Sequence, residues 1–301
     1  MRASRTVFAA GAASVFFGAS VVATRFVVAR TDPVSLAFLR YLIATVCLAP
    51  FLLAAVKVAM PRRDWAALTA LGVLFFGVFP WTFSAALVHL PASRVALLLA
   101  TMPLVTLTIS RARGVEPVTL SILGGQLLAL VGLWLALRQT GPAQLTGGRE
   151  WLGIMLTCVT VLCGAIYNVF SRPYLKRYLP LHVTALSMAA GTLFLAPIAM
   201  TRGVLAALPA FSSGAWMALI FLGTFGGALG FALWIWALER STPSRIAVFI
   251  ALNPVTATLL GALLMDEPVS LAFMVGLACV LGGIVLANWR PIRQVPDAAG
   301  V

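Results

Sequence analysis

Long apolar stretches constrain the fold of this chain more than any other feature. Ten stretches of predominantly apolar residues follow one another, joined by short loops. A helix needs about 20 such residues to cross the hydrocarbon core of a bilayer. Of the 301 residues, 61% are hydrophobic and 10% are charged, whereas soluble domains carry about 25% charged residues. We therefore predict an all-α integral membrane protein with ten transmembrane helices, embedded in the lipid bilayer and without a soluble domain.

The bounds of the predicted helices follow from the apolar stretches and from proline, which is tolerated at a helix start because its missing N–H would be unpaired there. In chain order we predict Thr6–Val28, Pro33–Val56, Trp65–Val88, Ala92–Ser110, Val118–Leu137, Glu150–Phe170, Pro180–Met200, Gly214–Leu238, Pro243–Met265 and Val269–Trp289. A signal peptide is the alternative for the first stretch, since Arg2 and Arg5 precede it. Its apolar core is longer than the usual core of about 7–15 residues, which favours a helix.

Basic residues are concentrated in the short loops and account for the formal charge of +13. If the N-terminus is cytoplasmic, fourteen Lys and Arg residues fall on the inside and five on the outside. Cytoplasmic loops carry such an excess, so we expect both termini in the cytoplasm. No basic patch alternates with aromatic residues in the manner of a nucleic-acid surface. We therefore expect no nucleic-acid partner.

Many residues recur at a fixed spacing along the chain. An identical residue follows after 151 positions for Trp65, Gly72, Pro103, Glu116 and Gly132, and after 147 positions for Arg25, Pro33 and Pro50. This spacing predicts two five-helix repeats, residues 6–138 and 150–289, followed by a short cytoplasmic tail, residues 290–301. Because five is odd, the second repeat must enter the membrane inverted. Inverted repeats are typical of secondary transporters, whose substrate site lies between the repeats near the midplane; duplication in a non-transporting membrane protein is the alternative.

Several local patterns together resemble the drug/metabolite transporter superfamily, EamA type. They are Phe17-Gly18-Ala19-Ser20 in the first helix, Leu39-Arg40-Tyr41 in the second, a proline within helices four and nine, and Tyr167-Asn168-Val169-Phe170 in the sixth. The resemblance implies a bacterial inner-membrane exporter of amino acids, nucleosides or related small metabolites, with a cavity lined by helices one, three, four, six, eight and nine. No Walker-type phosphate loop is present, which agrees with transport that does not hydrolyse ATP.

Two other functions remain as alternatives. A lipid flippase of the same fold would need a lateral opening toward lipid. An intramembrane acyl- or glycosyltransferase would need an acid, base or nucleophile within the membrane, and all eight Asp and Glu residues fall at loops or helix ends. Cysteine and histidine lack metal-ligand spacing, so we expect no metal and no cofactor. Whether the chain pairs as a homodimer stays open.

Two prolines mark the first candidate site residues. Pro103 and Pro254 occupy corresponding positions in helices four and nine. Corresponding interruptions in the two halves of a transporter point to its binding site, although a proline also produces a plain packing kink. Thr101 and Asn253 stand beside these prolines and would offer hydrogen bonds to a substrate or to a neighbouring helix.

Glycine and aromatic residues give further candidates in helices three and eight. Gly77, Pro80, Gly226, Gly227 and Gly230 permit close helix approach and bending during gating. We predict that Trp81, Phe231 and Trp234 line the substrate cavity, with membrane-interface anchoring as the alternative for tryptophan. These residues are read directly from the sequence.

Polar groups within the apolar stretches complete the candidate set. Arg40 lies about seven residues into helix two, and an intramembrane Arg is a functional candidate by default. We assign it a structural or gating role in preference to direct contact with the substrate, with snorkelling to the surface as the alternative. Tyr167 and Asn168 lie toward the cytoplasmic end of helix six, where they would line the inner vestibule.

Overall fold

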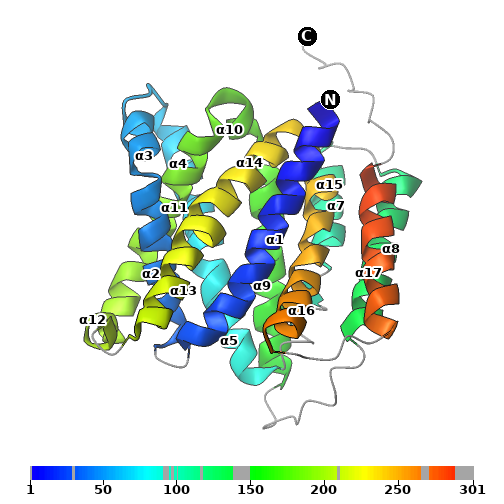
Figure 1. Cartoon of the computed structure of the whole chain (residues 1–301). Coiled ribbons are helices and arrows are strands. Elements are labelled where there is room, and N and C mark those ends of the chain that lie inside the picture. The colour runs from blue at the N-terminus through cyan, green and yellow to red at the C-terminus, as the bar shows by residue number, and fades with distance from the viewer. Residues whose placement is uncertain are drawn as a thin grey trace, which may run out of the picture.

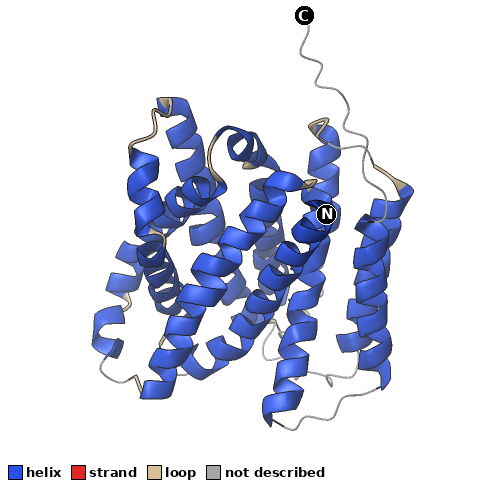
Figure 2. Ribbon diagram, turned by 45° about the horizontal axis from the view of Figure 1, so that its top comes forward, coloured by secondary structure: helices blue, strands red, loops and turns tan. Residues whose placement is uncertain are grey.

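Helices make up every regular element of the described structure. The computed structural model describes residues 2–28, 31–90, 95, 98–99, 101–115, 118–137, 150–208, 211–265 and 271–288. Across these residues Figures 1 and 2 show one bundle of helices and no strand. Five of the helices are long and apolar enough to cross a membrane, or six if one bent pair counts as a single span. The chain is therefore a helical membrane-type protein, as its composition predicts.

The first half of the chain begins with the long helix α1, Arg2–Val28. The elements that follow are α2 (Pro33–Cys47), α3 (Ala49–Val56), α4 (Arg62–Gly72), the π-helix η1 (Val73–Val78), α5 (Phe79–His89), α7 (Met102–Ala112) and α8 (Leu120–Leu137). Helix α2 starts where the Asp32 carboxylate accepts the N–H groups of Val34 and Ser35. Such a cap satisfies donors that have no partner inside the helix.

The second half begins with α9, Glu150–Phe170, which has the predicted bounds. It continues with α10 (Arg172–Arg177), α11 (Pro180–Thr201), α12 (Val204–Ala207), α13 (Ser213–Gly223), the π-helix η3 (Thr224–Leu229), α14 (Gly230–Arg240), α15 (Pro243–Ala247), the 3₁₀-helix η4 (Val248–Ala251), α16 (Leu252–Met265) and α17 (Leu271–Asn288).

Several predicted spans are broken into shorter segments. The predicted helix Pro33–Val56 bends by 69° between α2 and α3, where Pro50 stands in the first turn of α3. The predicted helix Pro243–Met265 is divided among α15, η4 and α16. Proline disfavours a continuous helix because it lacks an N–H and its ring clashes with the preceding turn. Breaks of this kind explain why fewer than ten helices meet the length criterion for a membrane span, and the count of ten stays a prediction.

Matching elements recur at the spacing found in the sequence. The run α4, η1 and α5 has the same bounds, shifted by 151 residues, as the run α13, η3 and α14. The same shift relates α8 to α17. A π-helix is rare and usually a single turn. Its presence at both positions gives the two halves one shared local geometry.

Contacts between the halves are reciprocal in α8 and α17, which lie side by side (Figure 1). A Cβ on Gly125 would come within 2.5 Å of the Gly283 carbonyl oxygen, and one on Gly132 within 2.6 Å of the Gly276 carbonyl oxygen. Gly276 is the counterpart of Gly125, and Gly283 is the counterpart of Gly132. Each glycine of one helix thus packs against the counterpart of the other, as a two-fold relation between antiparallel helices requires.

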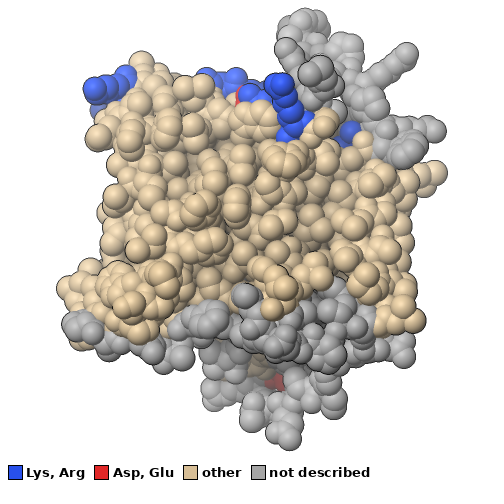
Figure 3. Space-filling view, viewed as in Figure 1, with Lys and Arg blue, Asp and Glu red and all other residues tan. Residues whose placement is uncertain are grey.

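The Lys and Arg side chains that Figure 3 shows gather at one end of the molecule. The α3–α4 connection, α10 and the end of α14, which lie at that end (Figure 1), carry the exposed residues Lys57, Arg62, Arg63, Lys176, Arg177 and Arg240. Helix α1 also begins there, whereas the long middle of the visible surface shows no charged side chain (Figures 1 and 3). A wide uncharged belt is the surface that lipid tails require.

Candidate functional site

A cluster of aromatic rings lies in the interior where the two halves meet. This ring cluster contains seven residues from α1, α2, η1, α9 and α14: Phe17, Tyr41, Phe75, Phe76, Tyr167, Phe231 and Trp234. Phe75 stacks on Tyr167 with centroids 4.3 Å apart, and Phe231 lies 4.8 Å from Phe76 and 4.7 Å from Phe17. Offset and edge-on ring pairs of this kind are favourable beyond their buried area.

The π-helices place the rings and leave space for them. Phe75 and Phe76 lie on η1, and their counterparts on η3 are Gly226 and Gly227. Beyond the π-helices, Phe79 corresponds to Gly230 in the same way. Three rings in the first half therefore correspond to three glycines in the second. The same local backbone carries bulk on one side of the site and none on the other.

Ring and glycine also exchange places on the facing helices. A Cβ on Gly230 would come within 2.9 Å of the Phe17 ring. The counterpart of Phe17 is Gly164, whose Cβ would lie 3.3 Å from the Phe79 ring. A large side chain thus meets a glycine in both halves, with the two roles swapped. Both contacts are close, but the shape of the interior is not symmetric.

Buried polar groups border the ring cluster. The Trp234 indole N–H donates to Oδ1 of Asn168 at 3.3 Å, and both side chains are buried. The Tyr167 hydroxyl faces Ser187, and neither hydroxyl is in a well-formed hydrogen bond with a described residue. Oδ1 of Asn253 also lacks a partner. A buried polar atom without a partner costs about 1–3 kcal/mol, so these atoms are suited to binding a polar ligand.

Arg40 places a charge at the edge of the ring cluster. Its Nη2 donates to the Gly226 carbonyl oxygen at 2.8 Å, and its guanidinium lies 5.5 Å from the centroid of the Tyr41 ring. An Arg at the centre of a membrane helix costs about 2.5–3.5 kcal/mol on insertion scales. The side chain reaches inward to η3, so the snorkelling alternative does not describe this structure.

The structure brings most of the predicted site residues together. Tyr167, Asn168, Phe231 and Trp234 belong to the ring cluster or contact it, and Gly226, Gly227 and Gly230 lie on or directly after η3. Trp81 is separate, with 39% of its surface exposed and its ring 6.5 Å from that of Phe194. Phe194 also fills the space beside Gly77, whereas Pro80 is buried at the start of α5.

The two prolines begin helices instead of bending them. Pro103 lies in the first turn of α7. Just before it, the Thr101 hydroxyl donates to the Leu98 carbonyl oxygen at 2.6 Å. Pro254 lies in the first turn of α16, directly after η4, and its side chain is outside the described part of the structure. A proline in the first turn loses no helical hydrogen bond, so each proline marks the point where a new segment starts.

Sequence reasoning missed several residues of the site. Phe75, Phe76 and Ser187 lie at the site without having been singled out, and Phe17 and Tyr41 entered only as parts of family patterns. The signal was present in the repeat itself, because aligning the halves places Phe75 and Phe76 opposite Gly226 and Gly227. Where aligned positions hold phenylalanine in one half and glycine in the other, both halves face the same interior space.

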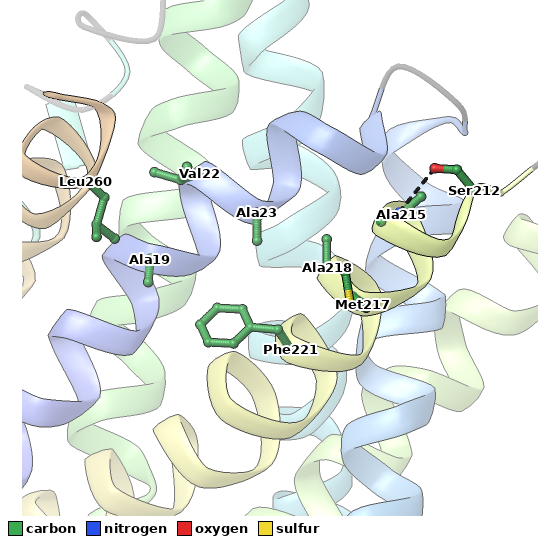
Figure 4. Close-up of a pocket in the computed structure, with 10 residues that line it drawn as sticks. Ala19, Val22, Ala23, Ser212, Ala215, Met217, Ala218, Phe221 and Leu260 are labelled. Atoms are coloured by element: carbon green, nitrogen blue, oxygen red, sulfur yellow. Dashed lines mark hydrogen bonds between the residues drawn. The ribbon is translucent and has the colours of Figure 1, made fainter. Parts of the chain in front are cut away.

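Two apolar grooves flank α1. One, of about 540 Å³, is lined by Ala19, Ala23 and Phe221 among others from α1, α13 and α16 (Figure 4). In Figure 4 Ala23, Ala218 and Phe221 point toward one another across the space between α1 and α13. The other, of about 670 Å³, lies between α1, α16 and α17 and includes Phe8, Phe16 and Phe249. Grooves with these linings suit hydrocarbon chains.

The described residues hold no cluster of three His, Cys, Asp or Glu side chains that would bind a metal ion. Fold and site together define a polytopic helical membrane protein whose interior holds a cluster of aromatic rings bordered by buried polar groups. The chain belongs to the EamA-like transporter family, whose model matches residues 4–138 and 151–289. The family model thus covers each half of the chain separately.

Three relatives of this chain are named as transporters. An uncharacterized transporter of Archaeoglobus fulgidus is 26% identical over 90% of this chain and 94% of its own length. A probable terminal-alkyne amino-acid exporter of Streptantibioticus cattleyicolor is 29% identical over 70% of this chain and 69% of its own. The uncharacterized inner membrane transporter YedA of Escherichia coli K12 is 26% identical over 91% and 87%. A solved crystal structure matches with a TM-score of 0.78 at 20% identity, over 95% of this chain and 97% of that one, which shows a shared fold.

Proposed function

We propose that this protein is a secondary transporter that exports small metabolites, with amino acids as the principal class, across the bacterial inner membrane. Ten transmembrane helices in two inverted five-helix repeats would alternate access to a site at the ring cluster. Membership of the EamA-like transporter family supports transport. The relative named as an amino-acid exporter supports both the class of cargo and the direction.

The observation that carries the proposal is the reciprocal packing of the halves around the site. Gly72 packs against the backbone of Ser187, and its counterpart Gly223 packs against the Ile43 side chain and the Arg40 carbonyl oxygen. Arg40 is in turn the counterpart of Ser187. The direction of the chain supports inversion, since α1 begins at the end of the molecule where α10 lies and α9 begins at the opposite end (Figure 1). Two similar halves of opposite direction around one site are the arrangement that alternating access uses.

Both termini would face the cytoplasm. The charged end of the molecule is also the end at which α1 begins and α17 finishes (Figures 1 and 3), and basic residues favour the cytoplasmic side. Reporter fusions test this directly: alkaline phosphatase joined to the C-terminus should be inactive and green fluorescent protein fluorescent. An active phosphatase fusion would reverse the proposed orientation.

Transport itself is tested in proteoliposomes. Labelled amino acids are followed by uptake and counterflow, with and without a pH gradient, for the wild type and for Asn253→Ala. We expect saturable flux that falls at least about tenfold in Asn253→Ala, the loss that a substrate hydrogen bond of about 1.4 kcal/mol would cause. Asn288→Ala is the matched control, because among the described residues that side chain bonds to the Ile284 carbonyl oxygen of its own helix alone. Wild-type flux no greater than in empty liposomes would refute amino-acid transport.

A second candidate function is lipid or lipid-precursor flipping. The two apolar grooves beside α1 favour it, because they offer space for acyl chains. A fluorescent phospholipid in the same proteoliposomes distinguishes the two. Protein-dependent flipping without amino-acid flux would establish the flippase, whereas amino-acid flux without flipping would exclude it.

A further inference from the structure

Arg40 has far fewer partners than its side chain can bind. A guanidinium carries five N–H donors, and the described structure assigns it one hydrogen bond, from Nη2 to the Gly226 carbonyl oxygen at 2.8 Å. Its Nε is buried without a partner. The Tyr41 ring, 5.5 Å away, is its other neighbour of note. The positive charge is therefore only partly satisfied by the protein.

Within the described part of the chain, no carboxylate contacts Arg40. The acidic side chains there are engaged elsewhere: Asp32 caps α2, Asp64 accepts from Tyr178, and Glu239 pairs with Arg240. Glu150 lies in the first turn of α9. The remaining acids fall in predicted loops or in the tail and are outside the described residues. A cation held in an apolar interior without a counter-ion favours binding of an anion.

Ser20 and Gly226 lie beside the guanidinium. A Cβ on Gly226 would overlap the Ser20 hydroxyl and would lie 3.4 Å from Nη2 of Arg40. A Cβ at this position would therefore displace the Ser20 side chain where α1, α2 and η3 meet. The Ser20 hydroxyl donates to the Phe16 carbonyl oxygen at 2.7 Å, so its oxygen remains able to accept a hydrogen bond from an ammonium group.

This set of residues is present in one half only. The counterparts of Ser20, Arg40 and Gly226 are Tyr167, Ser187 and Phe75. In that half the same positions form a ring stack with a neutral hydroxyl beside it. One cation on one side of the rings matches a substrate with one anionic group and an apolar body.

We infer that Arg40 binds the carboxylate of the transported substrate, while the rings of Phe17, Tyr41 and Phe231 contact its apolar part. This rests on the proposed function and names its substrate class as α-amino acids with large apolar side chains. A guanidinium recognises a carboxylate through two parallel N–H donors. Ser20 lies beside the carboxylate and positions the substrate ammonium group.

Competition between a carboxylate and its amide tests the inference. Counterflow of labelled L-phenylalanine is measured in the presence of unlabelled L-phenylalanine or L-phenylalaninamide, which differ only in the carboxyl group. The wild type should prefer the carboxylate at least about tenfold, the preference expected from one charged hydrogen-bonded contact. Arg40→Gln should lose that preference, and Arg40→Lys should keep part of it because Lys retains the charge without the planar fork.

Two controls separate a binding role from a structural one. Arg202→Gln removes the same charge at the exposed C-cap of α11 and should leave the preference unchanged. Gly226→Ala retains the charge but displaces Ser20 and Arg40, and should reduce the preference as Arg40→Gln does. A folded Arg40→Gln protein, with the wild-type melting temperature, that still prefers the carboxylate tenfold would overturn the inference.

A binding readout distinguishes failure of this inference from failure of transport. The melting temperature of the purified wild type is measured with millimolar L-phenylalanine and with its amide. A rise with the carboxylate alone, absent in Arg40→Gln, supports the carboxylate site even if no flux is found. Equal shifts with both compounds, or no shift with either, would refute it.

Discussion

Thr45 and Thr192 occupy equivalent positions in the two halves, and their hydroxyl oxygens hydrogen-bond to each other at 3.1 Å. A residue that contacts its own counterpart must lie on the axis relating the halves. Gly191 and Phe76 pack together beside this point, as do their counterparts Ala44 and Gly227. The axis therefore passes between α2 and α11, close to the ring cluster.

The threonine pair should stabilise the contact between the halves. Thr45→Val and Thr192→Val each remove one hydroxyl, and a double-mutant cycle should give a coupling of about 0.6 kcal/mol, typical of a hydrogen bond between membrane helices. Unfolding in a detergent titration measures it. Thr157→Val is the control, because that hydroxyl bonds only within its own helix, to Gly153. Strictly additive effects of the two valines would show that the hydroxyls do not interact in the membrane protein.

The α8–α17 contact should depend on glycine at one position and tolerate a change at the next. Gly125→Ala would place a Cβ 2.5 Å from a backbone oxygen of α17, whereas a Cβ on Gly124 meets only the Leu286 side chain at 3.5 Å. Forced overpacking costs about 1–3 kcal/mol. We therefore expect Gly125→Ala to lower the free energy of unfolding by that amount and Gly124→Ala to change it little. Equal effects would argue against this helix contact.

Removing one partner of the hydrogen bond between Trp234 and Asn168 should cost more stability than removing both. Trp234→Phe leaves Oδ1 of Asn168 buried without its donor, which should cost about 1–3 kcal/mol of stability. Adding Asn168→Leu removes the unpaired group, so the double variant should recover part of the loss. Thermal unfolding of Trp234→Phe, Asn168→Leu and the double variant measures this, with Trp216→Phe at a partly exposed site as control. A double variant less stable than the sum of the single effects would contradict it.

Tyr178 should make stability depend on pH at the alkaline end. Its hydroxyl donates to Oδ2 of Asp64 at 2.6 Å, and this bond raises the pKa of Tyr178 above its ordinary value. A raised pKa contributes stability fully below the unfolded pKa of about 10, and the contribution is lost as pH rises through the folded pKa. Tyr178→Phe should therefore be less stable at neutral pH and should lose less stability above about pH 10.

Melting curves from pH 7 to 12 compare Tyr178→Phe with the wild type and with Tyr174→Phe, a substitution on the same segment. Arg177 lies 3.6 Å from the same Asp64 oxygen and retains that contact in both variants. If Tyr178→Phe and wild type lose stability in parallel up to pH 12, the Tyr178 hydroxyl does not supply the alkaline dependence.

The amino-acid sequence by itself determined the class of the molecule. Charge is so sparse, and apolar stretches so long, that a helical membrane protein is the physical outcome. Local patterns such as Leu39-Arg40-Tyr41 were enough to indicate the family, which the family match confirms. Helix bounds in the most uniform stretches, such as Glu150–Phe170, also follow from local hydropathy.

Only the tertiary structure decided the interior. The π-helices η1 and η3 depend on how side chains pack across helices, because the switch in backbone hydrogen bonding carries no strong local signal. The break at Leu48 likewise turns a predicted single helix into two. The contact of Arg40 with Gly226 joins residues 186 positions apart. Hydropathy reports whether a residue prefers lipid to water, but which neighbour it meets is fixed by packing between distant segments.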